Sequence, residues 1–518
     1  MSLIGALSVA NGSLANINRQ FALVSQNIAN ANTPGYAAES ATQQSLTAEG
    51  VGLGVRSGPA TRNIDTALQS SVLLQNADVA GLQTRQAALS AIDSVHGTPG
   101  SGTDLASLVG DLQNQFSALL NDPGNVPQQS QVVSGAANLA DGINQLADTY
   151  GSQRQAAQND LVSAVDTLNT ALGTIGQLSN QIIAFQAGGR STADLENQRD
   201  AVVQTVSQLV QVRTLVQPNG DMLLFTTGGL ALPTRGGANP LHAAGATLGP
   251  ASWYPGDVSS GNPSIPAITL NGADVTGQLT GGRIGADITL RDTTLPTFQA
   301  ELDEFAQKLA SRFQDAGVAL FTDANGAVPA ESATSPPDPV QQPYVGFANG
   351  VQVNPDIRKS PELVRDGTVV PPPSPLPDGY ADIISNVLTN AFGSDQVSGA
   401  AQPGIKTRAL GPGGNLDAPF GPDWTDTSVP QTGMAGTLGA GATTLVAAQE
   451  QTSADVSSKL DTQQALQSSL AGKLAAGSAV NMDTEMSLMI QLQNSYAVSA
   501  RVISTVQTMW TQLLNAVQ

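Results

Sequence analysis

Residues 3–28, LIGALSVANGSLANINRQFALVSQNI, carry apolar side chains at alternating steps of four and three. This spacing is typical of a helix that packs one side against another helix in a heptad repeat. Pro34 cannot continue such a helix and Gly35 permits a turn, so we predict that the helix ends near Asn30. The predicted seam consists of Leu3, Leu7, Ala10, Leu14, Ile17, Phe21, Val24 and Ile28.

The other end of the chain repeats this spacing. Each end is also nearly uncharged, because residues 1–50 and residues 481–518 each hold two acidic side chains and one basic side chain. Sparsely charged amphipathic helices are marginal alone, so both ends are expected to need partners, either each other or neighbouring subunits. The predicted C-terminal seam consists of Met482, Met486, Met489, Gln493, Tyr496, Ala500, Ile503, Gln507, Trp510, Leu514 and Val517.

Length and composition favour a multidomain, mainly helical protein. At 518 residues the chain is longer than one ordinary domain. Hydrophobic residues make up 40% but aromatic residues only 4%, which suits close helix packing better than a deep ligand pocket. A net charge of −20 disfavours nucleic acid as a partner, and the lack of cysteine excludes disulfides and thiolate metal sites.

The N-terminal sequence has no basic opening followed by an apolar run, so we predict no cleaved signal peptide. No stretch approaches the roughly 18 apolar residues of a membrane span, so we expect no membrane partner. Export by a dedicated secretion apparatus would need neither feature.

Helical periodicity continues inside both ends. Two apolar runs, from Val132 to Tyr150 and from Leu161 to Ile182, predict long antiparallel helices. Further helices are predicted near residues 65–95, 103–121, 192–209, 295–316 and 441–477.

The centre changes to a strand pattern. Alternating residues from Val210 to Val216, a turn at Asn219 and Gly220, and a return strand from Met222 to Thr227 predict a hairpin. Gly- and Pro-rich sequence with short strand candidates continues to about residue 290.

We therefore predict a mainly α fold with an inserted β-rich domain, an α+β multidomain protein with paired N- and C-terminal helices, a long antiparallel helical bundle and a central β domain. The terminal coiled-coil domain comprises residues 1–50 and 480–518, and the helical bundle comprises 51–210, 291–320 and 436–479. The β-rich insertion comprises residues 211–290. Residues 321–435 form loops and irregular segments with a short helix at 380–392.

No pattern for catalysis, metal binding or a cofactor stands out. His96 and His242 lie in no metal or triad motif, and Gly50, Gly52 and Gly54 lack the Lys and Ser or Thr of a phosphate loop. The densest charge cluster, Asp194 to Asp200, is more typical of a solvated or salt-bridged helix face than of paired catalytic carboxylates. We therefore expect no enzymatic activity; an activity in the central insertion is the competing hypothesis.

Two terminal motifs resemble one family. SQNIANANTPGY, residues 25–36, resembles the signature of flagellar rod, hook and hook-associated proteins, and the helix from Met486 to Asn515 resembles the terminal helix of that axial family. In the middle, residues 194–212, 281–313 and 353–367 resemble the hook-associated branch. Ala37, Ala38, Glu39 and Trp510 depart from the family pattern.

The resemblance implies a structural component of the bacterial flagellum that connects hook to filament; a hook or rod subunit is the alternative. It implies export by the flagellar type III apparatus to an extracellular position. The implied partners are further copies of the chain, the hook protein, the filament-side hook-associated protein and an export chaperone that binds the C-terminal helix. The implied assembly-interface residues are Leu3, Leu7, Leu14, Ile17, Phe21, Val24, Asn27, Ile28, Asn30, Pro34, Gly35, Tyr36, Met486, Met489, Tyr496, Ala500, Ile503, Trp510 and Leu514.

Overall fold

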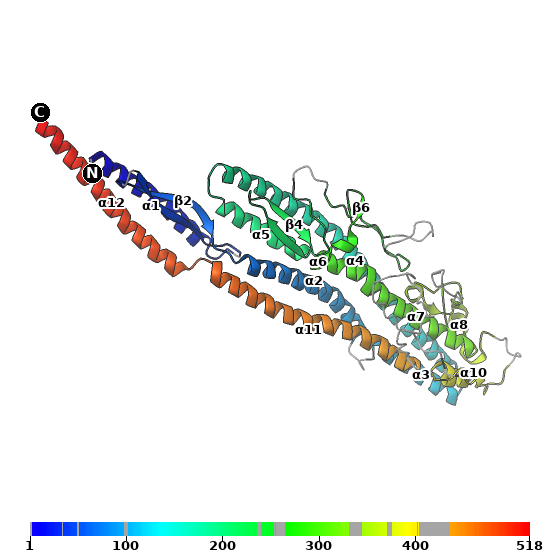
Figure 1. The fold of residues 1–518 in the computed structure, drawn as a ribbon. Helices are drawn as coiled ribbons and strands as arrows, with labels where there is room; N and C mark the ends of the chain where they lie inside the picture. Colours follow the sequence, from blue (N-terminus) through cyan, green and yellow to red (C-terminus); the bar gives the residue numbers. More distant parts are fainter. Residues whose placement is uncertain are drawn as a thin grey trace.

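The molecule is long and narrow, with both chain ends in a thin unit at one end and a helical bundle that extends to the other (Figure 1). The computed structural model describes residues 3–33, 35–48, 51–97, 102–235, 240–252, 254, 265–330, 344–369, 376–400, 402 and 436–517. It is 66% helical, with only small sheets, which confirms a mainly α fold.

The thin unit contains the first and last helices and one hairpin. Helix α1 (Leu3–Ala29) lies beside α12 (Met482–Val517), as the paired seams predict. Strands β1 (Glu39–Ala48) and β2 (Val51–Arg62) form an antiparallel hairpin that packs on α1. Gly54 has φ +122, a backbone conformation that favours a residue without a side chain.

The bundle begins with two long helices that run side by side. Helix α2 (Thr66–His96) starts at Asp65, whose side chain accepts hydrogen bonds from two main-chain N–H groups. Helix α11 (Leu438–Ser478) returns along it (Figure 1), and Gln75 donates to Gln463 at 2.7 Å across the contact. Helix α5 (Ala193–Leu209) packs on α2 near the thin unit, and α3 (Leu105–Asn121) packs on α11 at the far end of the bundle (Figure 1).

One expectation about the bundle is wrong. The two apolar runs predicted as separate antiparallel helices form a single helix, α4 (Val126–Ala187), of 62 residues. The polar stretch between the runs contains no proline and does not form a loop. Its side chains bind other segments instead: Arg154 donates to the carbonyl of Arg291, and Gln158 donates to the carbonyl of Ala244.

The middle of the chain holds short strands and a bent helix. The predicted hairpin is confirmed as β3 (Val212–Val216) paired with β4 (Met222–Thr226). Beyond it the described residues add only β5 (Thr269–Leu270), β6 (Ala273–Asp274) and the 3-10 turn η2 (Thr276–Gln278), so they do not form a β-rich domain. Helix α6 (Gly282–Thr289) then continues through the π-helical turn η3 (Leu290–Thr294) into α7 (Leu295–Asp315).

The far end is a cap of short elements around α7. It contains β7 (Phe321–Thr322), η4 (Phe347–Asn349), β8 (Gln352–Val353), α8 (Pro355–Lys359), α9 (Leu363–Asp366), α10 (Asp382–Asn386) and the π-helical turn η5 (Val387–Ala391). Together α10 and η5 account for the short helix predicted at 380–392. Phe313 lies at the centre of this end, with its ring 5.2 Å from that of Phe321 and 5.3 Å from that of Phe392.

A buried polar network crosses the bundle. The hydroxyl of Tyr150 donates to Oε1 of Gln449 at 2.6 Å, and Nε2 of His96 lies 3.0 Å from the same oxygen. Nε2 of Gln449 donates to Glu301 at 3.1 Å. The network joins α2, α4, α7 and α11, so it fixes how these helices are aligned along one another.

Candidate functional site

The terminal helix pair has a small apolar core. Ile17 and Val24 on α1 and Leu492 on α12 are buried together, and Phe21, Ile28 and Met489 pack partly against them. Because α1 and α12 run in opposite directions (Figure 1), these contacts close a short antiparallel seam. So few buried residues stabilise the pair only modestly, at about 1.5–3 kcal/mol for each fully buried side chain.

The predicted N-terminal residues mostly face this seam or the hairpin. Ile17, Val24 and Asn27 are buried, and Leu7, Leu14, Phe21, Ile28, Asn30 and Tyr36 are half-buried, whereas Gly35 is exposed. Pro34 and the side chain of Leu3 lie outside the described residues.

Only part of the predicted C-terminal seam faces α1. The positions of α12 that turn inward are Glu485, Met489, Leu492, Ser499, Ile503 and Val506. Met489 and Ile503 belong to both sets, but Met486, Tyr496, Ala500, Trp510 and Leu514 are exposed. Met486 and Ala500 each lie one residue, and hence about 100° around the helix, from an inward position, so they lie beside the contact with α1.

Helix α12 therefore presents apolar side chains to solvent. Val498, Val502, Met509 and Leu513 follow one another at steps of four, seven and four, which keeps them on one face of the helix. We call these four residues the outer stripe. Near the C-terminal end, where α12 continues past the start of α1 (Figure 1), Trp510 and Leu514 are exposed as well. A row of exposed apolar side chains on one helix face is typical of an interaction site.

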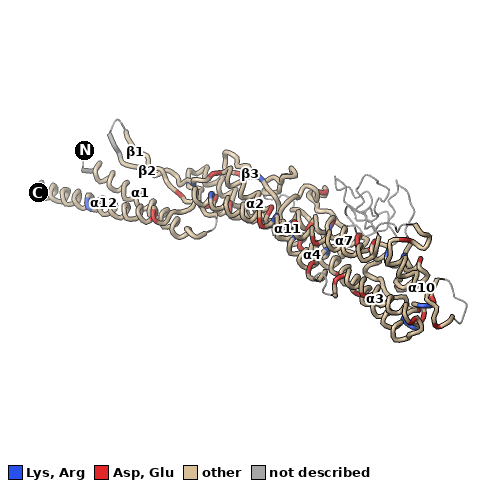
Figure 2. The backbone as a smooth tube through the Cα atoms, turned by 90° about the horizontal axis from the view of Figure 1, so that it is seen from below, with Lys and Arg blue, Asp and Glu red and all other residues tan. Residues whose placement is uncertain are grey.

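The charged residues of the chain lie mainly outside the terminal helix pair. Figure 2 shows few charged residues along the terminal pair and many acidic residues over the bundle. With −1 at each end, the net charge of −20 leaves −18 for the middle of the chain. An uncharged pair can approach a second copy without strong repulsion, whereas acidic bundles repel one another.

Asn27 connects the helix pair to the hairpin. Its side-chain amide donates to the carbonyl of Glu39 at 2.9 Å and to Oε1 of Glu485 at 3.0 Å. Its side-chain oxygen accepts from the main-chain N–H of Glu39 at 3.0 Å and from the hydroxyl of Tyr36 at 3.1 Å. One buried amide thus joins α1, the turn after it, β1 and α12.

Asn197 makes the equivalent connection to the bundle. It accepts from the main-chain N–H of Ala37 at 3.2 Å and donates to the carbonyl of Ala37 at 3.1 Å. Arg62 donates to Asn197 and forms ion pairs with Glu196 at 3.0 Å and Asp200 at 2.8 Å. The charge cluster noted in the sequence is therefore salt-bridged, and it ties α5 to the end of β2.

The turn that connects α1 to β1 has little conformational freedom. Gly35 has φ +79, and a side chain there would overlap the amide of Gln204. The main-chain N–H of Ala38 donates to the carbonyl of Ser478 at 2.8 Å, which fixes the turn to the end of α11. We call Asn27, Tyr36, Glu39, Arg62 and Asn197 the anchor cluster.

Burial raises the pKa values of Glu39 and Tyr36 in the anchor cluster. Burial, and secondly the charge of Asp194, raises the pKa of the Glu39 carboxyl. Burial also raises the pKa of Glu485, against the hydrogen bond from Asn27, which lowers it. The pKa of Tyr36 is raised well above its usual range by burial and by Glu39, so its hydroxyl remains a donor at neutral pH.

Comparison with known proteins relates parts of the chain to flagellar proteins. Residues 89–327 match the family described as "Flagellar hook-associated protein FlgK helical domain", and residues 472–516 match "Flagellar basal body rod FlgEFG protein C-terminal". The chain is 26% identical over 334 residues to "Flagellar hook-associated protein 1" of Escherichia coli (strain K12). It is 28% identical over 320 residues to the protein of that name from Salmonella typhimurium. The chain thus resembles flagellar hook-associated protein 1 over much of its length.

These alignments cover 62% and 60% of this chain, and 58% and 55% of the two relatives. The chain thus spans a little over half the length of the curated hook-associated proteins that it matches. A solved structure, "The structure of the flagellar hook junction protein FlgK from Burkholderia pseudomallei", aligns with a TM-score of 0.40 at 23% identity, over 51% of this chain and 47% of that one.

Metal-binding and membrane-spanning features were sought among the described residues. Within the described ranges, no group of three or more His, Asp or Glu side chains is placed to hold a metal ion. His96 belongs to the buried polar network, and the main chain of His242 pairs with that of Thr269. None of the described helices is long and apolar enough to cross a membrane.

Proposed function

We propose that the chain is a structural adaptor that joins the hook of a bacterial flagellum to its filament and is needed for filament assembly. The outer stripe of α12 is the observation that carries this proposal: a hook-associated chain presents an uncharged apolar helix face while the anchor cluster holds that helix to a folded bundle. An adaptor needs both an apolar helical surface that binds its neighbours and a folded domain that holds this surface in place.

Assembly would bury the outer stripe against the terminal helices of neighbouring copies. Its four side chains are 42% to 64% exposed, so each has roughly half of its surface left to bury. At about 1.5–3 kcal/mol for a whole side chain, each contributes about 1 kcal/mol, and the stripe contributes about 4 kcal/mol per subunit. Repeated around a ring or short helical layer, this gives a stable core with the acidic bundles outside.

The remaining assignments extend this proposal. The axial unit would comprise residues 1–50 and 480–518, the helical bundle 51–210, 291–320 and 436–479, and a compact β-containing insertion 211–290, with 321–435 as the irregular cap. We propose the hook protein, the filament-side hook-associated protein and further copies of the chain as partners. An export chaperone would bind α12 before assembly, and the chain would reach its extracellular position through the flagellar type III apparatus. No enzymatic activity is part of this function.

Localisation of an epitope-tagged chain on isolated hook-basal bodies tests the proposal. The tag belongs at the bundle end far from α12, so that it leaves the outer stripe unobstructed. We expect immunogold label in a single band at the distal end of the hook. Label along the whole hook or within the rod would support the alternative, a hook or rod subunit of the same axial family.

A further inference from the structure

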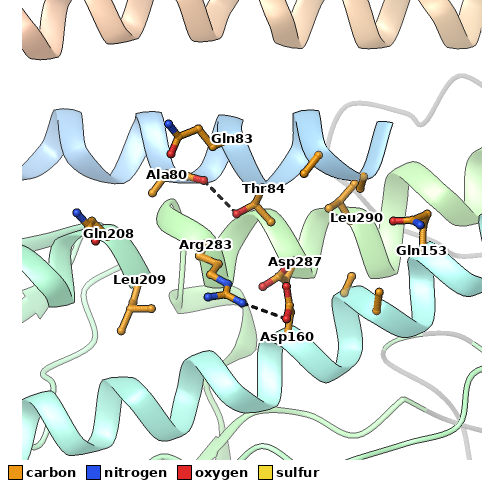
Figure 3. Close-up of a pocket in the computed structure, with 14 residues that line it drawn as sticks. Ala80, Gln83, Thr84, Gln153, Asp160, Gln208, Leu209, Arg283, Asp287 and Leu290 are labelled. Atoms are coloured by element: carbon orange, nitrogen blue, oxygen red, sulfur yellow. Dashed lines mark hydrogen bonds and ion pairs between the residues drawn. The ribbon is translucent and has the colours of Figure 1, made fainter. Parts of the chain in front are cut away.

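Two levels of the molecule lack continuous apolar packing. The first lies inside the bundle, at a groove between α2, α4, α5 and α6 (Figure 3). On α4 one apolar cluster ends at Ala157 and the next begins at Leu161. Helices α2 and α4 run through this level without a break, so they brace it. The second level is the junction between the thin unit and the bundle, which none of the described helices crosses.

The chain passes through this junction in two short connections. Residues 63–65 lie between β2 and α2, and residues 479–481 lie between α11 and α12. Each connection ends at a helix N-cap, because the side chains of Asp65 and Asn481 accept hydrogen bonds from main-chain N–H groups in the first turns of α2 and α12. Both connections therefore separate regular elements that could turn relative to one another.

The two connections lie close together. Glu39 pairs with Arg62 at the base of the hairpin, just before the first connection. The main-chain N–H of Ala38 donates to the carbonyl of Ser478, just before the second connection, at 2.8 Å. Two neighbouring non-helical connections allow rotation about the line that joins them, which is the geometry of a hinge.

Little apolar surface holds the two parts together. Within the described ranges, the buried apolar cluster around Ile17 contains no residue of the bundle, and the cluster around Val203 contains none of the thin unit. Ala37 and Ala60, which are buried in the thin unit near the junction, offer one methyl group each. The junction therefore depends on polar contacts rather than on a shared core.

The strongest of these polar contacts reach the first turns of α5. Arg62, at the end of β2, donates to Glu196 at 3.0 Å, to Asn197 at 3.0 Å and to Asp200 at 2.8 Å. The Arg62 side chain is only 11% exposed. A guanidinium held by two carboxylates in this way is a strong and directional contact. We call these four residues the clasp.

Arg62 also balances the acidic side chains at this corner of the molecule. Four carboxylates gather there, those of Glu39, Asp194, Glu196 and Asp200. Arg199, the neighbouring cation on α5, donates instead to the carbonyl of Gly220 within the bundle. Without Arg62 the carboxylates would repel one another across the junction, because Glu39 belongs to the thin unit and the other three belong to the bundle.

We propose that the thin unit turns as a rigid body about the two connections and that the clasp closes this hinge. With the clasp closed, the thin unit keeps the direction seen in Figure 1. With the clasp open, it swings away from α5 while α1 stays paired with α12, because the contacts of Asn27 with Glu39 and Glu485 lie within the thin unit and move with it. This inference concerns the isolated chain and does not depend on the proposed adaptor role.

Double electron–electron resonance on the purified full chain tests the hinge. The chain has no cysteine, so Ser495→Cys on α12 and Thr170→Cys on α4 provide two exposed sites for spin labels. Ser495 lies about 20 Å along α12 from the connection, so a tilt of about 30° would move its label by about 10 Å. We expect one narrow distance distribution when the clasp is intact.

Two variants measure what the clasp contributes. Arg62→Met should open the hinge, so the distribution should broaden and extend to distances about 10 Å longer. Arg56→Met removes the same charge from an exposed position on the same strand and should leave the distribution narrow.

A reversed ion pair separates the role of charge from that of packing. Arg62→Glu should also open the hinge, and the further change Glu196→Arg should close it again, because it restores the ion pair with the charges exchanged. Loss of packing alone would not allow this recovery. Labels at Ser134 and Thr170, both exposed on α4, check the fold and should give the same distance in every variant.

Two results would overturn the proposal. One is a distribution as narrow in Arg62→Met as in the chain with the clasp intact, which would show that there is no hinge for Arg62 to close. The other is a distribution equally broad in both chains, since the clasp would then not hold the thin unit in place.

Discussion

Replacing Val498 by Asp tests whether the outer stripe of α12 is an assembly surface. Val498 is 64% exposed, so in the isolated chain the new carboxylate would remain in water. Exposed substitutions of this kind usually change stability by no more than about 0.5 kcal/mol. The variant should therefore fold like the wild type.

The substitution should instead weaken the contact that α12 makes with a neighbouring subunit. The variant loses about 1 kcal/mol of apolar burial at this position. It must also bury a carboxylate without a partner, which costs several kcal/mol even after relaxation. A total of at least about 3 kcal/mol weakens each subunit contact by a factor of a hundred or more.

Quantitative immunoblots of isolated hook-basal bodies measure this effect. We expect incorporation of Val498→Asp to fall below detection, while circular dichroism of the purified chain matches the wild type. Thr508→Asp adds the same charge to the same helix on another exposed face and should incorporate normally. Wild-type incorporation of Val498→Asp, or equal failure of both variants, would refute the role of the stripe.

Three further predictions concern the anchor cluster and the bundle. Asn27→Ala removes the hydrogen-bond partners of the main-chain N–H and carbonyl of Glu39. The loss of about 2 kcal/mol of local stability should speed hydrogen exchange at Glu39 about thirtyfold. Asn30→Ala is the control and should change this rate less than threefold. Phe313→Ala should lower the free energy of unfolding by about 3–5 kcal/mol in urea, because the ring packs against three other phenylalanines; a loss below 1 kcal/mol would contradict this. Burial raises the pKa of Glu301 to about 7, above its unfolded value, so its contribution to stability rises as pH falls from about 8 to about 5. His96 titrates in the opposite sense, so the effect of Glu301 is measured as the difference in the free energy of unfolding between wild type and Glu301→Gln. This difference should change by roughly 3 kcal/mol over that pH range, and an unchanged difference would refute the prediction.

Much of the architecture could be predicted because it depends on local spacing. Heptad steps located α1 and α12, and the Asn219–Gly220 turn between alternating residues located the β3–β4 hairpin. The single helix α4 was missed because its polar middle resembles a loop. Nothing nearby in the sequence reveals that Arg154 binds the carbonyl of a residue 137 positions away.

The anchor cluster could not be predicted for the same reason. Asn27 was named from a motif, but its contact with Glu485 spans 458 positions, and Asn197 meets Ala37 across 160. The only local signal was the charge density from Asp194 to Asp200, which marks a salt-bridged face without naming its partner.

Local spacing alone establishes that both ends of this chain are nearly uncharged amphipathic helices that need partners, because an α-helix repeats every 3.6 residues and its apolar stripe follows from neighbouring positions. Which side of α12 faces α1 and which side remains uncovered depends on contacts between residues far apart in the sequence. Met486 and Glu485 differ by one position and hence by about 100° around the helix, and both positions continue a plausible seam. The anchor cluster selects between them, because Asn27 on α1 donates to Glu485 and so holds that side of α12 against α1.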